Sequence, residues 1–277
     1  MKNIVLVTDS TAYLTEDEVN RYGIHVVPLS VNFEDGSIVD SLGDAQAFFA
    51  RVDASAKVPF TSQPSVGQFV EVYEKLMEQN KEVISIHISS KLSGTVESAG
   101  GAARMLNQEK ITVFDSQQTA FPLAFLVLAA AQWIEEGLSR PEVVARLEKS
   151  RQEIRTYFVP DTLEYLKKGG RIGGAQALLG TLLQIKPVLY LNEGRVEVFD
   201  KVRTRKKAIA RVLEEMPPDS DTLQVAVAHC LAYEEAVQVK EMILGIVPRA
   251  QVEIRDLGPV ISIHTGPRVL GIATWPR

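Results

Sequence analysis

Short apolar runs alternate with segments of helical periodicity through the first half of the chain. Runs rich in Val and Ile predict strands, and apolar residues three or four positions apart predict helices. The predicted strands cover residues 4–7, 25–31, 83–88 and 111–114. The predicted helices cover residues 15–23, 44–53, 66–79, 95–106, 119–136 and 141–153. Strands and helices in alternation indicate a mostly parallel sheet with helices on both faces.

The second half of the chain has a different pattern, with a predicted hairpin and mixed strand spacing. Helices are predicted at residues 162–168 and 173–183, from 204 onward and at 234–244. Strands are predicted at residues 185–191, 195–201, 223–228, 252–254 and 260–263. The fold class is therefore α/β with two domains, the second built on a mixed sheet. We expect the N-terminal domain to span 1–159 and the C-terminal domain 160–277.

Two hydroxyl-rich segments, both expected to be turns, each stand directly before a predicted helix. They are Thr61-Ser62-Gln63-Pro64-Ser65 and Ser89-Ser90-Lys91-Leu92-Ser93-Gly94-Thr95. The first turn of a helix carries unpaired N–H groups and a partial positive charge, which suit an anion. Hydroxyls there either cap the helix or turn outward to hold an oxyanion. The sequence leaves both interpretations open: two ordinary helix caps, or a site for a carboxylate or phosphate.

Composition narrows the class of partner. Of 277 residues, 45% are hydrophobic and 23% charged, and the net charge is −5. This balance argues against nucleic acid as a partner, although the short basic cluster at residues 201–207 suits a phosphate or an acidic protein. The lone Cys230 excludes an internal disulfide and fits a reducing compartment. The longest apolar stretch, residues 120–134, is too short to span a bilayer. We expect a cytoplasmic protein.

Catalytic and metal-binding motifs are not recognisable in the sequence. The four histidines have no ligand spacing, so no metal site is predicted. We expect His87, inside an apolar run, to be a hydrogen-bonded core residue. His264 follows a predicted strand in a turn-forming segment, where a structural and a functional role are both open. Asp9 and Asp115 follow strands and suit orienting hydroxyls more than binding a metal. Many hydroxyls with few candidate bases favour binding over nucleophilic catalysis.

Several ordered motifs together resemble the DegV family of bacterial fatty-acid-binding proteins, the FakB-type carriers. The early motifs are Thr8-Asp9-Ser10, the two hydroxyl-rich segments and Asp115-Ser116. The longest matching stretch runs from Leu163 through Gly169-Gly170-Arg171-Ile172 and Gly180 to Leu189. The match closes with Gly258-Pro259-Val260-Ile261 and His264-Thr265-Gly266-Pro267. The resemblance covers nearly the whole chain.

The resemblance implies a two-domain carrier that is not itself an enzyme and needs no cofactor. Such a carrier buries a long-chain, palmitate-like fatty acid between its domains. It presents the carboxylate to a separate fatty acid kinase, which makes an acyl phosphate for phospholipid synthesis. The implied carboxylate ligands are Thr61, Ser93 and His264, supported by Ser62, Gly94, Thr95 and Thr265. Arg171 and Arg203 resemble positions that face the kinase or the new phosphate. A monomer with at most transient membrane-surface contact is expected.

Two departures from the family pattern bear on the pocket. Arg268 stands where the family commonly has a small residue, which would narrow or recharge the mouth of the site. The segment Phe121-Pro122-Leu123-Ala124-Phe125 is bulkier than expected after Asp115-Ser116. It would reshape the tail pocket and so leaves the preferred chain length open.

Other function classes compete with the carrier. One is a kinase-like phosphotransfer subunit, and another is a serine hydrolase that would use Ser93 as nucleophile and His264 as base. A third class, a small-molecule or DNA-linked regulator, is disfavoured by the acidic charge balance and by the lack of a recognisable DNA-reading helix.

Overall fold

The computed structural model describes residues 3–106, 109–179 and 185–277. The chain divides into two compact units, each assembled from several segments. Unit 1 is made of Met1–Val31, Ser37–Ser41 and Thr61–Gln152. Unit 2 is made of Asn32–Gly36, Leu42–Phe60 and Glu153–Arg277. The expected domain boundary between residues 159 and 160 stays a prediction.

Unit 1 is built on a four-stranded sheet in the order β2-β1-β6-β7, and each neighbouring pair is parallel. Its strands are β1 (Ile4–Asp9), β2 (His25–Val27), β6 (Glu82–His87) and β7 (Ile111–Asp115). Parallel strands end at a common edge, and here β1, β6 and β7 end in Asp9, His87 and Asp115. The predicted parallel sheet is confirmed.

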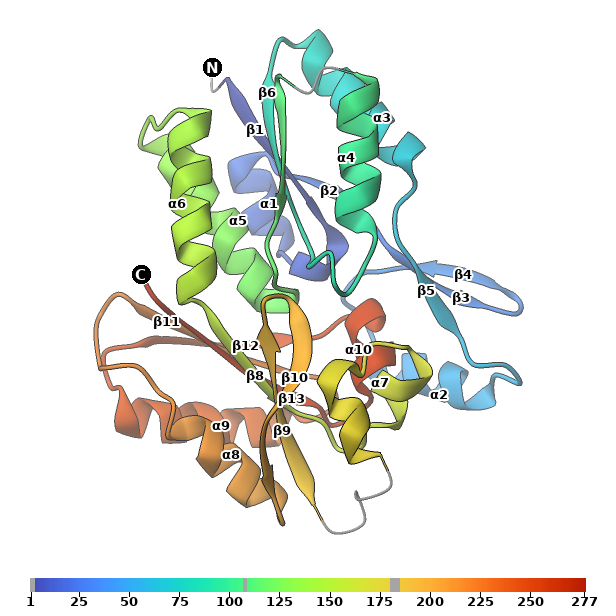
Figure 1. Ribbon diagram of the computed structural model, residues 1–277, viewed down its shortest axis with the longest axis vertical. Coiled ribbons are helices and arrows are strands. Elements are labelled where there is room, and N and C mark those ends of the chain that lie inside the picture. Colours follow the sequence, from blue (N-terminus) through green and yellow to red (C-terminus); the bar gives the residue numbers. More distant parts are fainter. Residues whose placement is uncertain (1–2, 107–108, 180–184) are drawn as a thin grey trace. The chain divides into compact units, whose positions relative to one another are not determined.

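Helices cover both faces of this sheet (Figure 1). They are α1 (Glu16–Tyr22), α3 (Val66–Glu78), α4 (Thr95–Met105), α5 (Ala120–Glu135) and α6 (Arg140–Glu153), with a 3₁₀ turn η1 (Ser10–Ala12). On one face α3 and α4 pack together against a core that includes Phe69, Val83 and Ala102. On the other face α5 contacts β1 and β6. Because α5 is apolar around most of its circumference, nearly all of its side chains are buried.

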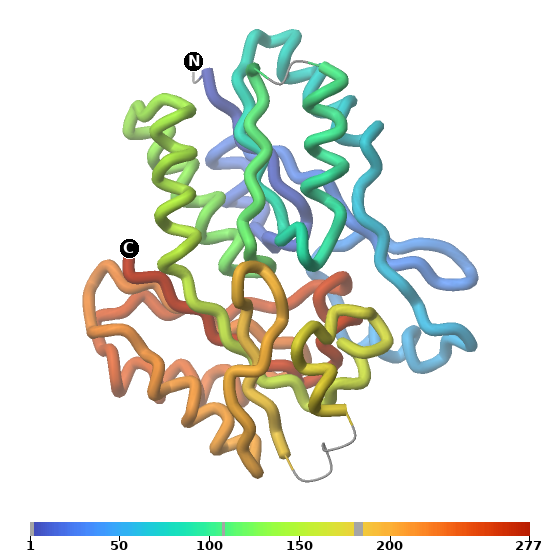
Figure 2. Tube along the Cα trace, viewed as in Figure 1, coloured from blue at the N-terminus to red at the C-terminus, as the bar shows by residue number. Residues whose placement is uncertain are grey.

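Unit 2 contains a mixed six-stranded sheet in the order β10-β9-β8-β13-β11-β12. Its strands are β8 (Arg155–Val159), β9 (Lys186–Asn192), β10 (Arg195–Val202), β11 (Leu223–His229), β12 (Gln251–Asp256) and β13 (Leu270–Pro276). Only β11 and β12 pair in parallel; the other described pairs are antiparallel. The predicted hairpin between β9 and β10 is confirmed and can be followed in Figure 2. Glu193 and Gly194 both have positive φ there, as a tight hairpin turn requires.

The helices of unit 2 are α2 (Ala45–Ala54), α7 (Glu164–Lys168), α8 (Arg205–Leu213), α9 (Tyr233–Ile246) and α10 (Pro259–Thr265), with a 3₁₀ segment η2 (Gly173–Leu178). Side chains of α8 and α9, such as Ile209 and Ile243, pack with Val225 and Val227 of β11 in one apolar core. A small third sheet has the order β4-β3-β5. Its strands are β3 (Ser30–Phe33), β4 (Gly36–Val39) and β5 (Phe60–Ser62).

Several local predictions are wrong. Residues 260–263, expected as a strand, belong to helix α10, whose first residue is Pro259. A proline at that position lacks an N–H that the helix would leave unpaired anyway. Thr61 and Ser62, expected in a turn, lie on strand β5. The single strand expected at 25–31 is interrupted around Pro28 and becomes β2 and the start of β3.

The expected helix at 173–183 is only partly testable. Residues 173–178 form the tighter 3₁₀ segment η2. Positions 180–184, including Gly180, lie outside the described residues.

Arg268 has a left-handed backbone, with φ of 60°. This geometry costs a non-glycine residue about 1–2 kcal/mol. We therefore expect Arg268→Gly to raise the free energy of unfolding by about 0.5–1 kcal/mol after the extra chain entropy of glycine is counted. Urea unfolding would measure the change. Arg203→Gly is the matched control, because Arg203 is also exposed but is not among the positive-φ residues. The free energy of unfolding of this variant should not rise.

Candidate functional site

The hydroxyls of Ser93 and Thr95 face each other at the start of α4, with their oxygens 2.9 Å apart. The helix has Gly94 as its N-cap residue and no side-chain cap hydrogen bond. The first predicted segment behaves differently, because Ser65 caps α3 through a reciprocal capping box with Gln68. One of the two segments therefore contains an ordinary cap. The other leaves the N-terminus of an eleven-residue helix without a capping side chain and with two hydroxyls beside it.

The two hydroxyl-rich segments lie against each other in unit 1. The amide of Gln63 packs so closely on Gly94 that a β-carbon there would stand 2.2 Å from the Gln63 Oε1 atom. The same amide donates through Nε2 to the Ser98 hydroxyl on α4, at 3.0 Å. Thr61 and Ser62, just before Gln63, are partly buried, and so is Ser93. The structure thus brings the strand that carries Thr61 and Ser62 to the start of α4.

The loop between β6 and α4 is held by the ends of neighbouring strands. The Asp115 carboxylate accepts hydrogen bonds from the Ser90 main-chain N–H at 3.2 Å and from the Ser90 hydroxyl at 2.5 Å. The main-chain N–H of Ser89 donates to the Gln118 carbonyl at 2.8 Å. The Ser89 carbonyl in turn accepts from the N–H of Ser93 at 3.1 Å. Asp115 therefore orients hydroxyls and amides, as the sequence indicated.

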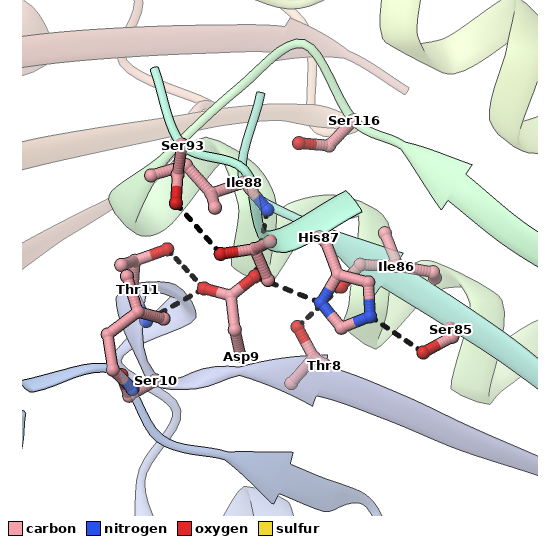
Figure 3. A network of polar contacts seen from close by, with 12 residues as sticks. Thr8, Asp9, Ser10, Thr11, Ser85, Ile86, His87, Ile88, Ser93 and Ser116 are labelled. Carbon is pink, nitrogen blue, oxygen red and sulfur yellow. Dashed lines mark hydrogen bonds and ion pairs between the residues drawn. The ribbon is translucent and has the colours of Figure 1, made fainter. Parts of the chain in front are cut away.

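A second, fully buried polar network lies beneath this loop (Figure 3). His87 Nδ1 is 3.0 Å from an oxygen of Asp9, and its Nε2 is 2.7 Å from the Ser85 hydroxyl. The Tyr73 hydroxyl donates to Ser85 at 2.7 Å. Burial raises the pKa of Tyr73 above its ordinary value, so the phenol keeps its proton. The prediction that His87 is a hydrogen-bonded core histidine is confirmed.

The order Ser85, His87, Asp9 is that of a hydrolase triad, but its surroundings do not suit catalysis. A nucleophile has to reach a substrate, and the Ser85 side chain is completely buried. Its oxygen already accepts a hydrogen bond from the Tyr73 hydroxyl. Ser85 is therefore not a nucleophile in this network.

His264 lies in unit 2 on helix α10, where its ring packs against the backbone of Gly169. A β-carbon at residue 169 would stand 2.0 Å from the Nδ1 atom of His264, so only glycine fits there. Burial, and then the positive charge of Arg171, lower the pKa of His264 to about 4. A neutral imidazole with so low a pKa is a poor general base near pH 7. This argues against the hydrolase in which His264 would activate Ser93.

The low pKa of His264 predicts a pH-dependent stability. Between pH 6.5 and about 4 the unfolded chain binds a proton at this residue that the folded chain does not. Stability is thus fully present above pH 6.5 and falls by up to about 3 kcal/mol as the pH drops through this window. Urea unfolding of the wild type and of His264→Gln would measure it. The variant should lose most of this slope. What remains comes from His25 and His229, whose pKa burial lowers, and near pH 4 from Asp35, Glu142 and Asp219, whose pKa hydrogen bonds lower. Equal slopes would contradict the assignment.

The other predicted site residues of unit 2 have varied surroundings. The Thr265 hydroxyl donates to the carbonyl of Ile261, one turn earlier in α10, at 3.0 Å. Arg171 is partly buried, and its Nη1 donates to the Gly169 carbonyl at 2.6 Å, beside His264. Burial lowers the pKa of the Arg171 guanidinium. Arg203 is exposed in the turn before α8 and makes no hydrogen bond or ion pair with any residue that the structure describes.

The structure also shows the surroundings of the two departures from the family pattern, Arg268 and the segment 121–125. Arg268 is exposed after α10, and its carbonyl accepts a hydrogen bond from Arg205 at 2.6 Å. Phe121 and Phe125 are buried on α5 with their rings edge to face, 5.0 Å between centroids.

Neither a metal centre nor a membrane span is found in the described part of the chain. No three His, Cys, Asp or Glu residues within 3–106, 109–179 and 185–277 are grouped to hold a metal ion. Over the same ranges, no helix has both the length and the apolar character needed to cross a bilayer.

Sequence reasoning missed Gln63 and Gly169, and it did not connect Asp9 with His87. One signal was present for the buried network. Ser85 and His87 are two positions apart in an apolar strand, so they share a face and need polar partners there. Their partners Tyr73 and Asp9 come from other elements, and only the fold identifies them.

Comparisons with known proteins agree with this architecture. The sequence model of the DegV family, described as an uncharacterised protein family, matches residues 3–277. Protein DegV of Bacillus subtilis is 37% identical over 275 residues, covering 98% of each chain. A solved structure of a DegV family protein from Thermus thermophilus, described by its fatty acid binding, is 40% identical with a TM-score of 0.89 over 99% of each chain. The structure of a stearic-acid-binding protein from Eubacterium ventriosum is 26% identical, with a TM-score of 0.87 over 99% of this chain and 98% of that one.

The predicted fold class is confirmed, because the parallel sheet of unit 1 and the mixed sheet of unit 2 occur in a chain that superposes on these structures over nearly its whole length. The family model spans residues 3–277, and a relative above 30% identity covers almost the entire chain. This chain belongs to the DegV family.

Proposed function

We propose that this protein binds one long-chain, palmitate-like fatty acid and presents its carboxylate to a separate fatty acid kinase. The observation that carries the proposal is the start of α4, where the Ser93 and Thr95 hydroxyls stand beside a helix N-terminus without a side-chain cap. Thr61 and Ser93 bind the carboxylate, with Ser62, Gly94 and Thr95 as supporting groups. His264 and Thr265 are further head-group residues. The fatty acids bound by relatives from Thermus thermophilus and Eubacterium ventriosum support this choice of ligand.

The chemistry of a fatty acid suits such a site. Hydroxyls and helix-terminal N–H groups satisfy a buried carboxylate, which would be very costly to leave without donors. They also leave it outside an ion pair, so its oxygen remains available to accept a phosphoryl group. The acyl tail contributes about 0.8 kcal/mol for each methylene removed from water. A long chain therefore supplies ample affinity even after the cost of association.

Native mass spectrometry of the purified protein tests the binding. We expect a co-purified mass equal to that of one long-chain fatty acid per protein chain, lost on denaturation. The delipidated protein should rebind palmitate at one-to-one stoichiometry. A protein that neither carries nor rebinds a fatty acid would refute the proposal.

The kinase step is assigned to a partner, because the hydroxyls are committed to binding and no working nucleophile–base pair is evident in the described residues. Protein, ATP and fatty acid alone should yield no acyl phosphate until the kinase is added. Turnover by the isolated chain would instead favour the phosphotransfer-subunit alternative. We further propose that the protein acts as a cytoplasmic monomer with at most transient contact with membrane surfaces and none with nucleic acid.

Arg171 and Arg203 are proposed to face the kinase or the new phosphate. Arginine suits this role because its planar guanidinium can bind phosphate through two hydrogen bonds. We expect Arg171→Ala and Arg203→Ala to keep fatty-acid affinity nearly intact while acyl-phosphate formation falls about tenfold or more, the worth of one charged hydrogen bond. Raising the salt concentration should narrow the difference between variant and wild type. Arg21→Ala, an exposed arginine on α1, is the control and should change neither quantity. Variants that bind the lipid more weakly but support normal turnover of the lipid they hold would show that these residues belong to the head-group site.

A further inference from the structure

The Asp9 carboxylate is a buried point on which four donors converge. One oxygen accepts from the Thr11 main-chain N–H at 3.1 Å and from the Thr11 hydroxyl at 2.5 Å. The other accepts from the Ile88 N–H at 2.9 Å and faces His87 Nδ1 at 3.0 Å. Asp9 is completely buried at the end of β1. A buried carboxylate with this many donors fixes the groups around it, because losing any of these bonds leaves a polar group without a partner.

Through the hydrogen bond from the Ile88 N–H, Asp9 contacts the start of the segment that carries Ser93. Ile88 directly follows β6, and the hydroxyl loop begins at the next residue. Asp115 and Gln118 hold the loop at Ser90 and Ser89. Asp9 is thus the anchor nearest to the strand, and the direction in which the loop leaves β6 depends on it.

His87 fixes the orientation of that anchor. The Tyr73 hydroxyl donates to the Ser85 oxygen, so the Ser85 proton is free to point at His87 Nε2. With Nε2 as acceptor, the neutral ring carries its proton on Nδ1, directed at Asp9. The ring of Phe69 packs edge to face on His87, 5.1 Å away. We call this chain of hydrogen bonds the relay: it runs from Tyr73 in the core through Ser85 and His87 to the Asp9 carboxylate.

We propose that Asp9, oriented by His87, is the positioning residue of the carboxylate site. By fixing the Ile88 N–H it places the Ser93 and Thr95 hydroxyls for a charged head group, and so sets the preference for a free acid over a neutral lipid. This inference rests on the proposed function. A purely structural Asp9 would alter stability and affect all ligands alike. A positioning Asp9 alters the discrimination between head groups.

The test compares palmitate with its methyl ester, which has the same tail and no charge. Competition against a fluorescent fatty acid measures both affinities for wild type, Asp9→Asn and Tyr73→Phe. We expect the wild type to prefer the acid by about tenfold or more, as charged hydrogen bonds exceed neutral ones. Asp9→Asn should lose most of that preference while ester affinity stays within about twofold of wild type. Tyr73→Phe is the control: Ser85 keeps its own proton for His87 Nε2, so this variant should keep the preference. Loss of the preference in Tyr73→Phe would overturn the assignment to Asp9.

The possible outcomes separate this inference from the proposed function. Failure of the wild type to bind palmitate would refute the function itself. Binding with an unchanged acid-to-ester ratio in Asp9→Asn, or an equal loss for both ligands, would overturn the role of Asp9 alone. If Asp9→Asn does not fold, His87→Asn and His87→Leu replace it, because only Asn keeps a donor near the Nδ1 position. The ratio should then survive in His87→Asn and fall in His87→Leu. Equal ratios in these two would overturn the inference.

Discussion

A variant that combines Thr61→Ala with Ser93→Ala is expected to bind a long-chain fatty acid about 2–6 kcal/mol more weakly than the wild type, if the two effects add. Each hydroxyl is expected to contribute about 1–3 kcal/mol, since its loss leaves part of a buried carboxylate without a donor. Each single variant should bind the fatty acid about 1–3 kcal/mol more weakly than the wild type. Titration calorimetry on delipidated protein, with thermal unfolding to confirm an intact fold, measures the change.

Ser65→Ala is the matched control for this experiment. Ser65 lies in the same segment as Thr61, but its hydroxyl caps α3 by accepting a hydrogen bond from the main-chain N–H of Gln68. Its loss should lower the free energy of unfolding by about 1 kcal/mol and leave affinity unchanged. If the double variant also kept its affinity, the head group would have to bind elsewhere.

Gly173→Ala is expected to destabilise unit 2 by about 3 kcal/mol or more, one of the largest effects of a single methyl group in this chain. Gly173 has φ of 50°, which an alanine adopts only at a cost. Its β-carbon would also stand 2.1 Å from the carbonyl oxygen of Val196 on β10. A main-chain atom inside a sheet cannot move aside without disturbing the ladder. Urea unfolding of the variant gives the magnitude.

The adjacent Gly174 provides the control. A β-carbon there would meet the Glu197 carboxylate at 1.8 Å, but that group ends a flexible side chain and can rotate away. Gly174→Ala should therefore cost less than about 1 kcal/mol, in the range of ordinary surface substitutions. Equal losses at both positions would mean that the β10 backbone yields more easily than its packing suggests.

Elements with local signals could be predicted from the sequence. The helix predicted at 15–23 begins with a capping box of Thr15 and Glu18, and Gly23 ends it. The turn at Asn192-Glu193-Gly194 gives the expected hairpin. Each of these signals is a short-range hydrogen bond or backbone preference that depends on a few neighbouring residues. Alternation of such elements was enough to predict the parallel sheet.

Elements whose state depends on distant partners were predicted wrongly or missed. The run Val260-Ile261-Ser262-Ile263 is short and β-branched, so its pattern does not separate a strand from a buried helix. Helix α10 packs against α7, and that contact is not visible in the local sequence. Strands β8 and β13 were not predicted, although they pair with each other in the middle of the sheet.

The candidate site shows the same division. The hydroxyl segments were visible because each precedes a helix. The link from Asp9 to Ile88 joins residues 79 positions apart, and only the parallel pairing of β1 with β6 brings them together. Whether Thr61, Ser93 and His264 serve one ligand stays a prediction.

The position of β13 has a consequence for biosynthesis. This strand is the last along the described chain, yet it lies between β8 and β11 in the middle of the unit 2 sheet. A ribosome makes β8 more than a hundred residues before its partner, because Val159 pairs with Leu270. Until Leu270–Pro276 emerges, β8 and β11 each present an unpaired edge that invites aggregation. All segments of unit 1 have been made by Gln152, whereas the sheet of unit 2 lacks its β13 strand until the end, so the nascent unit 2 is the part that would need a chaperone.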